Sequence, residues 1–124
     1  MLLSEKFYQD TLSLCEITER VRFSDENDQR PNALTSEITH QIIEDSILLK
    51  HSVYNALYDH ASLKQHFSLI RLAMILAKNL QSYLRGLEYD HAVNKEYLKL
   101  SKRALRLYRR LLLANYNQWR AQLN

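Results

Sequence analysis

The amino-acid sequence predicts an all-α protein: an up-down-up-down four-helix bundle with an extended C-terminal helix, formed as a single domain by residues 1–124. The first reason is the scarcity of residues that break helices, because the chain contains one glycine and one proline. Sheets joined by tight turns use both residues repeatedly, so long helices are expected instead. The second reason is the spacing of apolar side chains, which recur every three or four residues through four long segments.

The first helix is predicted from Ser4, which can cap its start, to about Phe23. Its apolar side consists of Leu3, Phe7, Leu14, Ile17 and Val21. Residues 24–32 follow without any apolar periodicity and contain the only proline, so they are predicted to form a loop.

The second helix is predicted from a cap at Thr35 or Ser36 to about His60. Its apolar seam consists of Ile38, Ile42, Leu49, Val53 and Ala56. A seam at this spacing lies on one face of a helix, and we expect that face to point into the core of the bundle.

The third helix is predicted to begin with a capping box at Ser62 and Gln65, and to end at Gly86 in a left-handed C-cap. The fourth helix is predicted from a cap at Asp90 to about Gln122. The connections between these helices are short, which favours antiparallel neighbours.

The fourth helix contains a heptad pattern of apolar residues at alternating spacings of four and three. We predict that this pattern is its core seam: Val93, Tyr97, Leu100, Ala104, Leu107, Leu111 and Ala114. A second apolar line beside the seam is formed by Leu98, Leu105, Leu112 and Trp119.

The predicted fourth helix is long enough for its end, beyond about Leu112, to extend past the bundle. Apolar residues in that segment would then need a cover, and a second copy of the chain is the simplest one. The predicted interface of a homo-oligomer therefore consists of Leu105, Leu112, Tyr116 and Trp119.

Charges are sorted along the chain. Residues 1–61 contain 5 Lys/Arg and 11 Asp/Glu, whereas residues 62–124 contain 12 Lys/Arg and 3 Asp/Glu, and the net charge is +3. Such asymmetry indicates a polyanionic partner, or pairing between the acidic and the basic half of one assembly.

The cations of the basic half are spaced so that they share faces of the third and fourth helices. If these helices are antiparallel neighbours, the two faces join into one predicted nucleic-acid-binding surface, for RNA or DNA. Its eleven residues are Lys64, Arg71, Lys78, Arg85, Lys95, Lys99, Lys102, Arg103, Arg106, Arg109 and Arg110.

An alternative interpretation of the same residues is a charged, solvated face. Every surface helix needs one, and Lys and Arg are good helix formers. In that case we expect a protein–protein interaction module, such as a chaperone, an immunity protein or an inhibitor, which binds a protein partner through its Leu, Tyr and Trp side chains.

No motif in the sequence names a reaction, so we predict a protein that is not an enzyme and has no cofactor. A single glycine excludes phosphate-binding loops and nucleophile elbows. Two Glu-x-x-His pairs, Glu37…His40 and Glu88…His91, resemble di-metal bundle ligands, but the inward glutamates such a site also needs are missing, so no metal site is predicted. The single cysteine, Cys15, is predicted to be a core residue.

The sequence predicts neither a signal peptide nor a membrane span. The N-terminal residues become charged within five positions, and the longest apolar stretch, residues 69–77, is interrupted by Arg71. We therefore expect a cytoplasmic protein without a membrane partner.

Overall fold

The structure, a computed structural model, describes residues 5–21, 33–59, 62–89 and 93–122. It contains helix α1 (Glu5–Glu19), α2 (Ala33–Tyr58), α3 (Leu63–Gly86) and α4 (Lys95–Gln122). Of the described residues, 91% are helical and none forms a strand. The predicted all-α, four-helix architecture is confirmed. The predicted loop at residues 24–32 and the predicted caps Ser4 and Asp90 lie outside the described residues.

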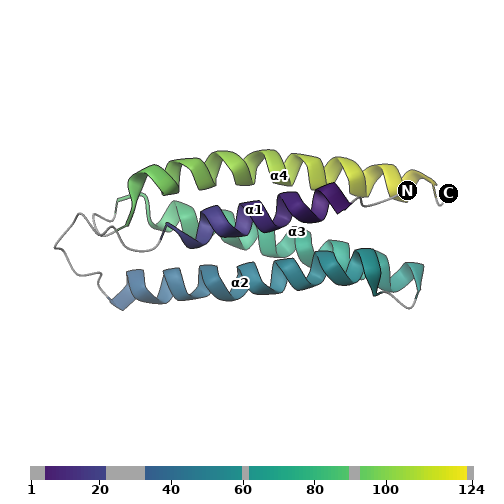
Figure 1. The fold of residues 1–124 in the computed structure, drawn as a ribbon, viewed down its shortest axis with the longest axis horizontal. Coiled ribbons are helices and arrows are strands. Elements are labelled where there is room, and N and C mark those ends of the chain that lie inside the picture. Colours follow the sequence, from purple (N-terminus) through teal and green to yellow (C-terminus); the bar gives the residue numbers. More distant parts are fainter. Residues whose placement is uncertain (1–4, 22–32, 60–61, 90–92, 123–124) are drawn as a thin grey trace.

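The four helices form a ring of neighbours, in which α1 packs against α2 and α4, and α3 packs against the same two helices (Figure 1). The chain reverses direction from each helix to the next in that view. Contacts of α4 with this part of the chain show the same reversal, because Phe67 of α3 lies against Tyr116 whereas Glu88, in the turn after α3, lies against Lys102.

The first helix is shorter than the sequence predicts. Its last turn tightens after Glu19, where the backbone N–H of Val21 donates to the carbonyl of Thr18 at 3.2 Å. The Val21 side chain is fully buried, and its carbonyl accepts a 3.2 Å hydrogen bond from the N–H of Asn94. This bond ties the end of α1 to the start of α4.

The start of α3 agrees with the prediction and its end does not. Ser62 is the N-cap, and its side chain accepts a 3.1 Å hydrogen bond from the N–H of Gln65. Gly86 is not a left-handed cap, since no described residue has a positive φ. The cap residue is instead Leu87, at φ −96° and ψ −1°, whose fully buried side chain draws this turn into the core.

The apolar seam of α2 is confirmed. Four of its residues, Ile42, Leu49, Val53 and Ala56, are at most 2% exposed, and Ile38 is partly buried against the same core. The core also receives Phe7 and Leu14 from α1.

The predicted core seam of α4 is wrong for its three leucines, whereas Val93 is buried and Tyr97 and Ala104 are partly buried against the core. Leu100, Leu107 and Leu111 are 44%, 60% and 44% exposed. The buried line is the neighbouring one, formed by Leu98, Ser101, Leu105, Tyr108 and Leu112. Tyr108 explains the rotation, because its ring stacks on Phe7 at 5.1 Å and its hydroxyl lies 2.8 Å from that of Thr11.

The start of α4 also differs from the prediction. The side-chain oxygen of Asn94 accepts a 3.1 Å hydrogen bond from the N–H of Tyr97, so Asn94 caps the helix and the first helical residue is Lys95. With 28 residues α4 is the longest helix, but α2 has 26 and α3 has 24. Its last turns therefore do not outrun the bundle but lie beside the first turns of α3, where Tyr116 contacts Phe67.

Candidate functional site

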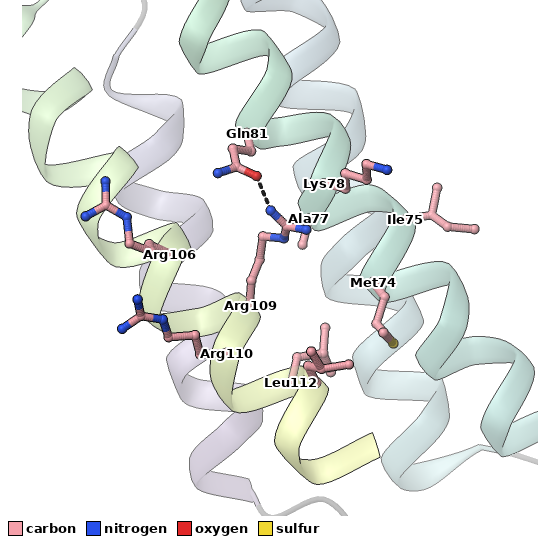
Figure 2. Close-up of a pocket in the computed structure, with 10 residues that line it drawn as sticks. Met74, Ile75, Ala77, Lys78, Gln81, Arg106, Arg109, Arg110 and Leu112 are labelled. Carbon is pink, nitrogen blue, oxygen red and sulfur yellow. Dashed lines mark hydrogen bonds between the residues drawn. The ribbon is translucent and has the colours of Figure 1, made fainter. Parts of the chain in front are cut away.

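A groove of about 430 Å³ lies between α3 and α4 (Figure 2). Its apolar floor comes from both helices: Met74, Ile75 and Ala77 of α3, and Leu112 and Leu113 of α4. Polar residues surround the floor, namely Lys78, Gln81, Arg106, Arg109 and Arg110. Within the described part of the chain, no Asp or Glu lines this groove.

The local sequence explains why the groove is open. Ala77 and Leu112 are at most 1% exposed and lie where the two helices meet. Because the side chain of Ala77 is only a methyl group, space remains between the helices that a larger side chain would fill. Two of the floor residues, Ile75 and Leu113, are 57% and 47% exposed, so the floor presents apolar surface to solvent.

One arginine of the groove is held in place. The Arg109 guanidinium donates a hydrogen bond to the side-chain oxygen of Gln81 across the groove (Figure 2). Lys78, Arg106 and Arg110 are exposed. The groove thus combines one fixed guanidinium with three solvent-facing cations.

Two smaller hollows, each about 320 Å³, lie on the same two helices. One is lined by Lys95, Leu98, Lys99, Lys102, Arg103 and Arg106 of α4. The other is lined by Lys64, Phe67, Arg71, Tyr116 and Arg120, and contains two aromatic rings whose centroids are 5.9 Å apart.

The structure brings most of the predicted cations together along these three hollows. Only Arg85 of the eleven lines none of them. Arg120 is a further cation that sequence reasoning missed, although it follows Arg109 by eleven residues, which is about three helical turns.

Two of the predicted cations hold the chain in place. Lys102 forms an ion pair with Glu88, and Lys95 Nζ donates to the Glu88 carbonyl at 2.7 Å. The hydrogen bond from Lys102 lowers the pKa of Glu88, and the charges of Lys102, Arg85 and Lys95 act in the same direction. These contacts fasten the turn after α3 to the first turns of α4.

Three acidic residues of α1 and α2 pair with partners in their own half of the sequence. Glu16 pairs with Arg20 at 3.0 Å, Glu19 with Lys50 at 3.6 Å, and Glu44 with His40 at 3.0 Å. In the described ranges, no ion pair joins a carboxylate of α1 or α2 to a cation of α3 or α4.

The predicted oligomer interface needs correction. Leu105 and Leu112 are 1% exposed and belong to the core of the single chain, because α4 is rotated relative to the prediction. Tyr116 is partly buried against Phe67, and the side chain of Trp119 lies outside the described residues. Besides Leu113 in the groove, α4 exposes Leu100, Leu107 and Leu111, and we call these three the outer strip.

Candidate metal ligands and nucleophiles do not assemble in the described ranges. His40 and Glu88 are paired with Glu44 and Lys102, and no group of three metal-ligating side chains occurs there. Cys15 is fully buried, which raises the pKa of its thiol from 9.0 to about 12. Such a thiol stays protonated near neutral pH and is a poor nucleophile.

No protein-family model, no curated protein and no solved structure matches the chain. Of the four described helices, none is both long and apolar enough to cross a bilayer. The groove and the cations around it are therefore the features of the described chain that bear on function.

Proposed function

We propose that this protein is a non-enzymatic, helical-bundle accessory protein that docks the α3–α4 face on nucleic acid, or on a nucleoprotein complex. The observation that supports this function best is the groove itself. It gathers Lys78, Arg106, Arg109 and Arg110 from two helices, and no carboxylate of the described chain lines it.

The spacing of the cations suits a phosphate backbone. Lys64, Arg71, Lys78 and Arg85 follow one another at intervals of seven residues, about 10 Å along a helix. Each strand of B-form DNA carries one phosphate for about every 3.4 Å of helix axis, so this interval corresponds to roughly three nucleotides along the axis. Arginine guanidinium groups also bind phosphate oxygens in a two-pronged manner. Affinity would come from charge neutralisation and counterion release, with little sequence preference.

The test compares two variants that lose the same charge. The groove variant carries Lys78→Gln, Arg106→Gln and Arg110→Gln, which are exposed side chains. The control variant carries Lys6→Gln, Arg20→Gln and Lys50→Gln in the acidic half. Binding to labelled RNA and DNA of about 20 nucleotides is measured by fluorescence anisotropy at about 50 mM salt.

The groove variant is expected to bind at least about tenfold more weakly than the wild type, and the control variant about as well as the wild type. If the wild type binds neither nucleic acid, the proposed function is wrong. Equal losses in both variants would also contradict it, since they would reflect net charge rather than a site.

The outer strip favours a second candidate, a protein–protein interaction module that includes self-association. Leu100, Leu107 and Leu111 expose 44–60% of their surface on one side of α4. Leu107→Ser should weaken any dimer measured by sedimentation at about 100 μM, whereas Leu34→Ser, at a 64% exposed position on α2, should not. If the wild type remains strictly monomeric at that concentration, the self-association part of this second candidate function is wrong.

A further inference from the structure

We propose that the α3–α4 groove selects single-stranded nucleic acid by holding an unstacked base on its apolar floor. This inference rests on the nucleic-acid function proposed above and names the form of nucleic acid that the site prefers.

The first argument is the chemistry of the groove floor. Phosphates need only cations, yet the cations here surround apolar surface, including the 57% exposed Ile75 and the 47% exposed Leu113. A double helix keeps the faces of its bases stacked inside, so it offers phosphate, sugar and base edges to such a surface but no base face. A single strand can turn a base into the groove while its flanking phosphates contact Lys78, Arg106 or Arg110.

The second argument is the fixed guanidinium of Arg109. Its hydrogen bond to Gln81 holds this planar group inside the groove (Figure 2). A guanidinium plane stacks well on an aromatic face, and a nucleobase has one. Because Gln81 already orders the side chain, less conformational entropy is lost when a base binds.

The third argument is the neighbouring aromatic hollow. Phe67 and Tyr116 lie there between Lys64, Arg71 and Arg120, with ring centroids 5.9 Å apart. Seven residues, about 10 Å of α3, separate Phe67 from Met74 on the groove floor. A single strand crossing both hollows would therefore meet two apolar surfaces that are a few nucleotides apart.

The test separates the contribution of the bases to binding from that of the phosphate charges. Three labelled ligands of about 12 nucleotides are compared by fluorescence anisotropy: a single strand, an abasic strand of the same length and charge, and the duplex of the same sequence. The wild type is expected to bind the base-bearing strand about fivefold or more tightly than the abasic strand. On charge alone these two strands would bind equally.

The variant for this test removes apolar surface without changing charge. Ile75→Ser with Leu113→Ser should bring binding of the base-bearing strand down to that of the abasic strand, and leave duplex binding within about twofold of wild type. The control is Leu72→Ser with Leu107→Ser, which are 41% and 60% exposed and do not line the groove. It should keep the preference, and circular dichroism verifies that both variants fold.

The outcomes are distinct. Equal binding of the base-bearing and abasic strands by the wild type overturns this inference and leaves the proposed function standing. If the variant with Ile75→Ser and Leu113→Ser loses binding to all three ligands equally, the inference is also overturned. The substitutions would then have weakened phosphate binding in general and not the binding of a base. If the wild type binds none of the three ligands, the proposed function fails and this inference fails with it.

Discussion

Cys15 lies in the core between α1 and α2, where its Sγ donates a 3.5 Å hydrogen bond to the carbonyl of Ser46. Burial is the main reason that the pKa of the thiol rises from 9.0 to about 12, while the positive charge of Lys50 acts in the opposite direction. In the unfolded chain the same thiol ionises near its ordinary pKa. The native state therefore holds this proton more tightly than the unfolded state does.

This difference predicts a loss of stability at alkaline pH. The contribution of Cys15 is fully present below pH 9.0 and is lost as the pH rises from 9.0 toward about 12, because only the unfolded thiol ionises in that window. Between about pH 8 and about pH 10 the free energy of unfolding should fall by about 1.4 kcal/mol more in the wild type than in Cys15→Ala. Urea denaturation at both pH values measures it. Equal pH dependence in the two proteins would show that the thiol is not held protonated.

Tyr108 shows how one side chain determines the orientation of a helix. Its ring stacks on Phe7, and its hydroxyl meets that of Thr11 at 2.8 Å. Burial raises the pKa of this phenol. A buried hydroxyl needs a hydrogen-bond partner, and Thr11 provides it only when the Leu105 side of α4 faces α1.

At the scale of elements, α4 carries two apolar lines, and only one of them enters the core. Both lines have alternating spacings of three and four, so both are typical of a core seam. The buried line is harder to detect in the sequence, because Ser101 and Tyr108 interrupt its aliphatic residues. Which line is buried depends on the side chains of α1 and α3 that pack against α4. Apolar periodicity within α4 does not identify those side chains.

The orientation of α4 predicts a contrast between two neighbouring leucines. Leu105→Ala removes a 1% exposed side chain and should lower the free energy of unfolding by about 2–5 kcal/mol. Leu107→Ala changes a 60% exposed side chain and should cost less than about 0.5 kcal/mol. Urea denaturation of both variants gives the comparison. A larger loss for Leu107→Ala than for Leu105→Ala would mean that the predicted heptad, and not the observed line, faces the core.

The sequence was sufficient for the number of helices, the cap at Ser62 and the buried face of α2. Each of these features depends on residues that are close together in the sequence: the spacing of apolar side chains, or one capping side chain near one backbone N–H. A sequence pattern is therefore enough to predict them. The ends of α1 and α3 were not predictable in this way. These ends depend on Val21 and Leu87, whose side chains are buried in the core. The helical conformation stops before each of these residues.

The candidate site was predictable in its charges and not in its shape. The seven-residue and four–three spacings were enough to place the cations on one side of each helix. The groove floor could not be predicted, because it depends on the rotation of α4 and on the small side chain of Ala77. The contacts of Lys95 and Lys102 with Glu88 could not be predicted from the sequence either, because they form only when α3 and α4 pack together.

At the scale of the whole molecule, the sorting of charge along the sequence becomes a sorting between helix pairs. Three acidic residues, Glu16, Glu19 and Glu44, pair within the α1–α2 half, while most cations of α3 and α4 line hollows on those two helices. A net charge of +3 therefore understates the local positive charge beside the groove. The field of such a charge distribution would orient the α3–α4 side toward a polyanion during approach.

The measurement that tests the central claim most directly is the salt dependence of binding to a single strand. Each neutralised phosphate contributes about −0.7 to the slope of log K against log salt concentration. We expect a wild-type slope of about −2 to −3, from three or four phosphates on the groove cations. The variant Lys78→Gln, Arg106→Gln, Arg110→Gln should have a slope about 2 units shallower, and the control Lys6→Gln, Arg20→Gln, Lys50→Gln the wild-type slope. A slope near zero, or one that the groove variant leaves unchanged, would contradict nucleic-acid binding by the α3–α4 face.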